Sequence, residues 1–450
     1  MTAFPKTFIF ATATAAYQVE GGYDDDGRGR STWDEIREES GRIADGSDPR
    51  LSCDARHKYK EDVQILKQLN VTHYRFSISW SRVFSDGTAT SLNEPGIGYY
   101  RALCEELVAN GILPIVTLFH TDLPLEIFDK GSWLNTETIH NFVSLCEVCF
   151  ERLGDLVPYW ITFNEIGHQA WYAVAKFDNL PWHCPNRPQP QEDAEKNTVS
   201  VTAHNMLLAH AQVYRLYEEK FKVFQKGQVG ITNSGRWCVP NSESPEDKEA
   251  CGRALDWNLN WTIEPILKDD YPRTMRQRLP WLPTFNEEQR RLLKNSIDFL
   301  GINYYISTTI KTLKKSEDGP SIFERHAGYD YGKERWDKIC GETWIRNAPD
   351  GLQQLLNYLK DNFDNLPVLI TENGCMDRLD AEGDPLKDDY RVVYLSDHLT
   401  LRNGCNVIGF TAWSLMDNFE WDDGFSYRFG LFRVDFVSPS KPRVIKKSGK

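Results

Sequence analysis

The chain of 450 residues lacks several features that would assign it to a membrane or to nucleic acid. Its N-terminus has no basic segment followed by a long apolar stretch, and no segment approaches the roughly 20 apolar residues that a membrane-spanning helix needs. Basic residues are also few, because 52 Lys and Arg stand against 65 Asp and Glu, which gives a net charge of −13. Such a surface repels phosphate backbones, so nucleic acid is not an expected partner. We expect a soluble, cytoplasmic protein.

Cysteine pairs of the kind that zinc sites need are scarce as well. The ten cysteines are scattered singly, except for Cys146 and Cys149 in a helical-looking segment. That pair has no second cysteine pair and no nearby histidine pair to complete a zinc site. We therefore expect buried, reduced thiols at these positions.

The chain does contain eight apolar runs rich in β-branched and aromatic residues, most of them followed by sequence with helical periodicity. Eight strands that alternate with helices predict a closed parallel (β/α)8 barrel, or TIM barrel. No repeat or low-complexity linker interrupts the pattern, so we expect one domain over residues 1–450, with elaborated loops after strands four, five and six. The expected strands lie near 8–17, 73–78, 113–119, 159–163, 228–232, 299–304, 368–371 and 407–412, and helical periodicity marks 204–221, 351–363 and 391–399.

Two of the strand-like runs end in a glutamate, Glu165 and Glu372. Strand ends of a parallel barrel face one mouth, so these carboxyl groups would face each other although they are far apart in the chain. Cleavage of a glycosidic bond needs such a pair, with one carboxylate beneath the anomeric carbon and one protonated carboxyl beside the leaving oxygen. Repulsion between the two would raise the pKa of one, and Arg75 near the other would hold it ionised.

Further polar and aromatic side chains stand at the other strand ends. Each of them taken singly is more often a packing residue, but together they converge on one small volume. Neutral hydrogen-bonding groups suit sugar hydroxyls, and an aromatic face suits the apolar face of a hexose. The strand-end residues are Gln18, Arg75, His120, Asn164, Asn303, Tyr305 and Trp413.

Four sequence blocks occur in a fixed order along the chain: residues 15–21 (AAYQVEG), 74–82 (YRFSISWSR), 371–374 (TENG) and 413–421 (WSLMDNFEW). Together they resemble glycoside hydrolase family 1, the retaining β-glucosidases and β-galactosidases. Within that family the resemblance is to the animal branch that includes cytosolic β-glucosidase, lactase domains and klotho. It runs from Phe4 to the C-terminus.

The resemblance implies a role for each matching position. Glu372 matches the nucleophile and Glu165 the acid/base. Arg75 and Tyr305 match the residues that orient the nucleophile and keep it charged, and Asn164 matches the residue that binds the sugar 2-hydroxyl. The remaining substrate-binding positions are Gln18, His120, Glu420 and Trp421 for the other hydroxyls, Trp413 as the platform, Phe429 as a wall, and Asn303 at its strand end.

The implied activity is hydrolysis of terminal β-linked glucose, galactose or fucose from small hydrophobic aglycones. The implied reaction passes through a covalent glycosyl-enzyme intermediate and needs no metal or organic cofactor. This retaining mechanism predicts that the two carboxyl groups lie about 5 to 5.5 Å apart. Glu420 stands where members acting on 6-phosphorylated sugars usually carry serine, which indicates an unphosphorylated sugar. Both glutamates are present, which favours a hydrolase; the alternatives are a klotho-like, non-catalytic barrel that binds sugar or protein, and a transglycosidase.

Some positions depart from the family pattern. Ile166 replaces the proline that usually follows Asn-Glu and is expected to loosen the backbone that aims Glu165, since proline fixes φ. Thr121 replaces an aromatic wall, and residues 177–185 lack the expected glycine and Ala-Pro-Gly landmarks. Aglycone preference is therefore the least transferable property. Residues 446–450 resemble only the start of the family's last helix, so we expect that helix to be incomplete; the sequence does not indicate the oligomeric state.

Overall fold

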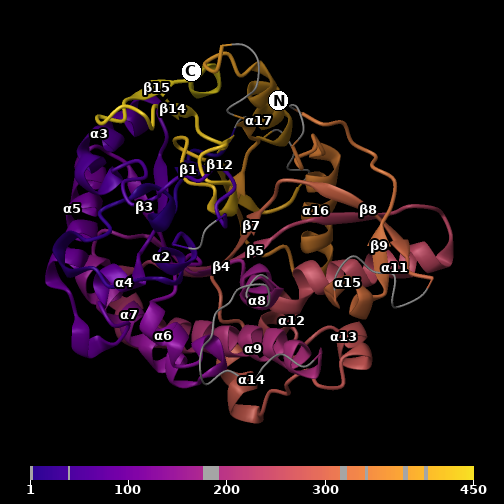
Figure 1. Cartoon of the computed structure of the whole chain (residues 1–450). Coiled ribbons are helices and arrows are strands. Elements are labelled where there is room, and N and C mark those ends of the chain that lie inside the picture. Colours follow the sequence, from indigo (N-terminus) through magenta and orange to yellow (C-terminus); the bar gives the residue numbers. More distant parts are fainter. Residues whose placement is uncertain are drawn as a thin grey trace.

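The structure is a computed structural model that describes residues 4–38, 41–175, 192–314, 322–339, 343–378, 384–399 and 404–450. Eight parallel strands close into a barrel in the order β1-β12-β10-β7-β5-β4-β3-β2, and helices surround it (Figure 1). This is the predicted (β/α)8 TIM barrel. The barrel strands are β1 (Ile9–Ala13), β2 (His73–Ser77), β3 (Leu113–Phe119), β4 (Tyr159–Asn164), β5 (Gln228–Ser234), β7 (Phe299–Asn303), β10 (Val368–Asn373) and β12 (Val407–Trp413).

Each of the eight predicted strands is part of the barrel, but the first is shorter than expected. It ends at Ala13 rather than near Tyr17, and a short helix, α1 (Ala16–Val19), follows. The amide of Ala16 donates to the Ser77 hydroxyl at 2.7 Å, so its acceptor is a side chain and not a backbone carbonyl of the neighbouring strand. The chain turns there and directs Gln18 to the barrel mouth instead of past it.

The barrel strands are apolar on both faces because helices cover the outside and side chains fill the inside. Every residue of β2 and β10 is buried, as expected for parallel strands between two layers. The predicted helices at 204–221, 351–363 and 391–399 are present as α9, α16 and α17. The longer helices are α3 (Ala55–Gln68), α5 (Glu94–Ala109), α7 (Glu137–Leu153), α9 (Glu192–Leu216, extended by a π-helical turn at Tyr217–Phe221), α11 (Pro245–Leu255), α16 (Pro349–Asn362) and α17 (Asp389–Leu399).

Shorter elements connect the barrel units and build its rim. Strands β6 (Trp237–Pro240), β8 (Ser307–Thr312) and β9 (Tyr329–Tyr331) form a separate sheet after β5 and β7, beside α11 in Figure 1. The pairs β11 (Asp377–Arg378) with β13 (Tyr427–Arg428) and β14 (Phe432–Val434) with β15 (Arg443–Ile445) lie after β10 and β12. The short helices are α2 (Thr32–Ile36), α4 (Trp80–Val83), α6 (Leu125–Asp129), α8 (Ile166–Ala175), α10 (Lys222–Gln225), α12 (Trp261–Leu267), α13 (Arg273–Arg278), α14 (Glu287–Leu293) and α15 (Ile322–Ala327).

An apolar plug fills the barrel below the C-terminal ends of its strands. Its buried members come from five different strands, so their packing joins the barrel wall across its centre. In β5, a side chain at Gly230 would collide with the Phe299 ring at 2.7 Å, so glycine makes room for this plug. The plug residues are Ile9, Ala11, Ile115, Ile161, Phe299 and Leu369.

Three other sequence expectations concern the edges of the molecule. Cys146 and Cys149 are buried free thiols, as predicted. The loop at 177–185 lies outside the described residues. Residues 447–449 form a single 3-10 turn after β15. Among the residues that the structure describes, no helix combines the length and the apolar character required to cross a membrane.

Candidate active site

A cavity of about 220 Å³ opens at the C-terminal ends of the barrel strands. Loops after several different strands line it, which is where TIM-barrel enzymes carry their active sites. Among the residues that sequence analysis singled out, those lining the cavity are Gln18, His120, Asn164, Glu165, Asn303, Tyr305, Glu372, Trp413, Glu420, Trp421 and Phe429. Arg75 lies in β2 beneath this cavity, and the structure thus brings the whole predicted set together.

Glu372, in β10, receives two strong hydrogen-bond donors. Nη1 of Arg75 lies 2.6 Å from Oε1 of Glu372, and the Tyr305 hydroxyl donates to Oε2 at 2.8 Å. Arg75 is fixed in turn, because it donates to the Thr117 hydroxyl at 3.1 Å and to the Thr371 carbonyl at 2.9 Å. Burial raises the pKa of Tyr305, so its hydroxyl stays a donor at neutral pH. These contacts match the orienting roles that the resemblance implies.

Glu165 follows β4 and has different partners. The side-chain amide of Asn303 donates to Oε1 of Glu165 at 2.9 Å and to Oδ1 of Asn164 at 3.0 Å. Nδ1 of His168 lies 3.0 Å from Oε2 of Glu165. Asn164 also accepts from Nη2 of Arg75 at 2.8 Å, so the two carboxyl groups belong to one hydrogen-bonded group.

The backbone at Glu165 is held from both sides. Its amide donates to the Thr232 carbonyl at 2.7 Å, and its carbonyl accepts from the amide of Gln169 at 2.9 Å. Ile166, where the family usually has proline, is fully buried and begins α8. Glu165 has a φ of 53°, and Thr121, which lines the cavity, has a φ of 76°. Left-handed backbone at non-glycine residues is costly and gathers at functional sites.

Burial raises the pKa of Glu372 to about 7, and the Glu165 carboxylate adds to this, while Arg75 and Tyr305 lower it. For Glu165, burial also raises the pKa, but His168 and Asn303 outweigh it and bring the pKa below its ordinary value. Sequence analysis expects Arg75 to hold its neighbouring carboxyl group ionised. Arg75 does lower the pKa of Glu372, but burial raises it, while His168, Asn303 and Arg75 lower the pKa of Glu165.

A second group of side chains forms the wall on the side of α1 and β12. The Nε2 atom of Gln18 donates to Oδ1 of Asn418 at 2.9 Å and to the Phe419 carbonyl at 2.8 Å, and lies 3.4 Å from Oε2 of Glu420. Its Oε1 atom is buried with no hydrogen-bond partner among the described residues. Burial, with Glu372 and Asp423, raises the pKa of Glu420 to about 8. This wall therefore offers a free acceptor and a carboxyl group that can donate.

Aromatic rings complete the cavity. The His120 ring stacks on Trp413 and on Trp421, with centroids 6.1 Å and 6.2 Å apart. Burial and Arg75 lower the pKa of His120, so the ring is neutral, and its Nδ1 has no partner among the described residues. Phe429 packs edge-on against Tyr305 with a centroid distance of 6.0 Å. Flat apolar faces thus alternate with open polar atoms, as a hexose requires.

Some lining residues were missed by sequence analysis. Trp33 in α2 lies with its ring 4.7 Å from that of Trp421. His168 had a usable signal, because a residue three positions after Glu165 at a helix start falls on the same side. Trp33 and Trp344 had none, because they do not follow an apolar strand directly, whereas Ser234 is the last residue of β5. The missed lining residues are Trp33, His168, Gln169, Ser234, Gly235, Arg236, Ile306 and Trp344.

A TIM barrel that holds a buried and a partly buried glutamate at one cavity is the arrangement that glycoside hydrolases use. The family model of glycosyl hydrolase family 1 matches residues 1–450. Myrosinase 1 of Brevicoryne brassicae is 40% identical, covering 99% of this chain and 96% of that protein. Beta-glucosidase 25 of Oryza sativa subsp. japonica is 38% identical, covering 96% of this chain and 90% of that protein. A β-glucosidase structure from the fungus Humicola insolens in complex with glucose has a TM-score of 0.92 at 35% identity. The match covers 100% of this chain and 97% of that one. The chain belongs to glycosyl hydrolase family 1 and is a glycoside hydrolase.

Proposed function

We propose that this protein is a retaining β-glycosidase that removes terminal β-linked glucose, galactose or fucose from small hydrophobic aglycones. The observation that carries the proposal is the division of partners between the two glutamates. Arg75 and Tyr305 donate to Glu372, as a carboxylate nucleophile needs, whereas Asn303 and His168 contact Glu165. Two carboxyl groups with separate partners at one cavity can take separate roles.

In the first step, Glu372 attacks the anomeric carbon of the bound sugar, and Glu165 protonates the departing oxygen. For this step, the one proton shared by the carboxyl groups of Glu165 and Glu372 must be on Glu165. Because Arg75 and Tyr305 stabilise the negative form of Glu372, moving the proton to Glu165 yields a carboxylate that is already oriented for attack.

In the second step, Glu165 takes a proton from water, and that water releases the sugar from Glu372 with net retention. Asn164 is well placed for both steps, since Arg75 and Asn303 fix its Oδ1 and leave its amide group to bind the sugar. Its amide Nδ2 lies 3.4 Å from Nε2 of His120. A contact from Asn164 to the 2-hydroxyl would strengthen as positive charge develops at the anomeric carbon.

The aglycone side of the cavity supports a small hydrophobic leaving group. Trp344 and Ile306 line the cavity beside Tyr305, and the Trp344 ring lies 5.7 Å from the Tyr305 ring. Trp344 keeps 47% of its surface exposed, so it offers an apolar face that an aglycone can cover.

The experiment that tests this function is intact-protein mass after incubation with activated 2-deoxy-2-fluoroglucosyl and 2-deoxy-2-fluorogalactosyl donors. The fluorine slows release, so a retaining enzyme accumulates one covalent sugar. We expect a single adduct on the unaltered protein and none on Glu372→Gln. The sugar that labels faster identifies the preferred glycone.

Two results would count against the proposal. Absence of an adduct with either sugar, on protein shown to be folded, would favour the non-catalytic, klotho-like alternative. An adduct that forms equally on Glu372→Gln would assign the nucleophile elsewhere. Product analysis in the presence of a simple alcohol separates hydrolysis from transglycosylation, since the same intermediate can pass its sugar to either acceptor.

A further inference from the structure

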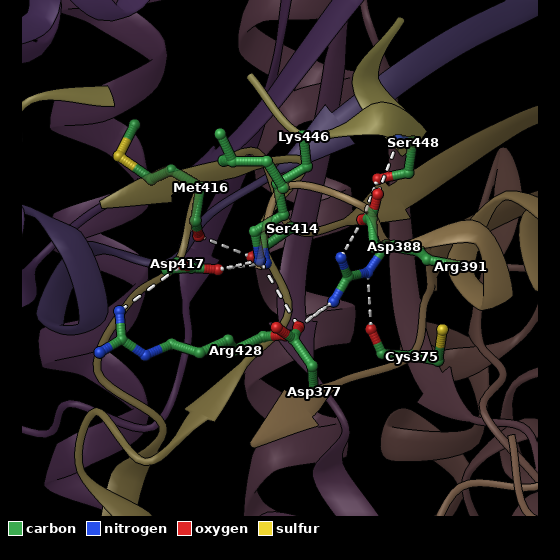
Figure 2. Close-up of polar contacts among 12 residues, drawn as sticks. Cys375, Asp377, Asp388, Arg391, Ser414, Met416, Asp417, Arg428, Lys446 and Ser448 are labelled. Atoms are coloured by element: carbon green, nitrogen blue, oxygen red, sulfur yellow. Dashed lines mark hydrogen bonds and ion pairs between the residues drawn. The ribbon is translucent and has the colours of Figure 1, made fainter. Parts of the chain in front are cut away.

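A buried network of charged side chains surrounds Lys446, the residue that follows β15, and Figure 2 draws its contacts. Three carboxylates and three cations make it up, and none of the six is more than 7% exposed. Buried charges of this kind are costly unless every one is paired. The members are Asp377, Asp388, Arg391, Asp417, Arg428 and Lys446.

Lys446 connects the two halves of this network. Its Nζ lies 2.8 Å from Oδ1 of Asp417 and 3.5 Å from Oδ1 of Asp377, and its side chain is 1% exposed. Asp377 comes five positions after Glu372, and Asp417 lies between Trp413 and Glu420. One ammonium group therefore joins the segment after the candidate nucleophile to the loop that supplies the sugar-binding wall.

The Asp417 end of the network reaches the sugar site through neighbouring groups. Its carboxylate also accepts from the amide of Gly430 at 3.1 Å, next to Phe429. The following residue, Asn418, accepts from Gln18 and donates to the Ser414 hydroxyl at 2.9 Å. A shift of Asp417 would thus move Gln18 and the loop bearing Glu420 together.

The Asp377 end is held by Arg391 of α17. The Arg391 guanidinium contacts Asp377 and Asp388 and donates to the carbonyl groups of Cys375 and Arg428, each at 2.9 Å. The chain after Lys446 closes this end, because the Ser448 amide donates to Asp388 at 2.9 Å. Residues 375–377 after Glu372 are therefore anchored to α17, and Lys446 links them to Asp417.

We propose that Lys446 is a positioning residue for sugar binding, which acts through Asp417 to set the wall formed by residues 413–421 against the segment after Glu372. Lys446 does not contact the cavity, so its effect is on affinity for the sugar ring rather than on proton transfer. The inference rests on the proposed function, because it takes this cavity to be the sugar site.

The test compares Lys446→Met with Arg443→Met. Arg443 begins β15, three residues before Lys446, and forms a buried pair at 2.9 Å with Asp62 of α3. It meets the 413–421 loop indirectly, through Cys53, whose thiol donates to the Asp417 carbonyl at 3.1 Å. Both variants lose a buried ion pair, so both should melt at lower temperature. Calorimetric titration with glucose and the KM for an aryl β-glucoside are measured for each.

We expect Lys446→Met to raise the Kd for glucose and the KM by about tenfold, since small displacements of binding groups have large effects, with kcat changed much less. Arg443→Met should leave both constants unchanged. Equal Kd and KM values in Lys446→Met and the unaltered protein would overturn the proposal, as would an equal loss of affinity in Arg443→Met.

A double variant, Lys446→Met with Asp417→Asn, separates positioning from charge burial. It also removes the Asp417 carboxylate that has lost its lysine partner, so its melting temperature should recover relative to Lys446→Met, while glucose affinity stays weak. Recovery of affinity together with stability, or failure of both variants to fold, would refute positioning. If the unaltered protein binds glucose but does not hydrolyse the glucoside, the proposed function fails while the glucose Kd values still decide this inference.

Discussion

The guanidinium of Arg75 lies 2.6 Å from Glu372, although 297 positions separate them in the chain. Both side chains are almost fully buried, at 1% and 7% exposed. A buried cation next to one of two neighbouring carboxyl groups stabilises the anionic form of that group. This relationship leads to the first prediction below.

Replacing Arg75 by methionine is expected to lower kcat by about 100-fold or more, because a preorganised donor to the nucleophile is lost. It should also raise the pKa of Glu372 above its present value of about 7, since Arg75 opposes the effects of burial and of Glu165. Less Glu372 is then ionised at a given pH, and because Glu372 has the higher of the two pKa values, the basic limb of kcat/KM moves to higher pH. A pH profile checks this. Thr117→Val, which removes only a support of Arg75, should show a smaller shift in the same direction.

Replacing His168 by glutamine is expected to move the acidic limb of kcat/KM to higher pH. His168 lowers the pKa of Glu165, which is the lower of the two, so its removal raises that pKa and a larger fraction of the pair holds its proton on Glu165. The matched control is His57→Gln, an exposed histidine that contacts Asp54 and does not line the cavity. An acidic limb that stays in place in His168→Gln, or that moves equally in His57→Gln, would contradict this role.

Glu165→Gln should separate substrates by their leaving groups. Hydrolysis of an alkyl β-glucoside, which needs a proton on the departing oxygen, is expected to slow by roughly 10²- to 10⁴-fold. A dinitrophenyl β-glucoside departs without that proton, so formation of its glycosyl-enzyme should be nearly unchanged. Burst kinetics measure this step directly. An equal loss with both substrates would mean that Glu165 is not the acid.

The apolar plug should support stability without affecting the sugar site. Ile115→Ala removes a fully buried side chain from that plug and is expected to lower the free energy of unfolding by about 2 to 5 kcal/mol. The KM should remain unchanged, because Ile115 does not line the cavity. Denaturant unfolding measures the first quantity and steady-state kinetics the second. A raised KM would show that the plug positions the catalytic residues as well.

Sequence analysis was most accurate for the barrel strands and for the residues directly after them. β3 begins and ends where the pattern predicted, and Glu165 and Glu372 lie at one cavity. These predictions succeeded because a buried strand is an uninterrupted apolar run, which is a local signal, and parallel strand ends share one edge of the barrel. The first strand was predicted too long because the bond from Ala16 to Ser77 joins residues 61 positions apart.

The loop residues of the site could not be predicted in the same way. Trp33 and Trp344 reach the cavity from segments that carry no strand or motif signal, and only the folded chain brings them beside Trp421 and Tyr305. Residues 446–450 resemble the start of a helix, and 447–449 form a 3-10 turn, but only the folded chain shows that Lys446 lies between Asp417 and Asp377.

The amino-acid sequence alone thus determined the barrel, the family and the two glutamates, because periodicity and motifs depend on residues that are close in the chain. The order of the two pKa values and the charge network behind the site were decided only by the tertiary structure. The physical reason is that desolvation and electrostatic interactions depend on distances in space, and burial at Glu372 and the His168 contact at Glu165 arise only after the barrel closes.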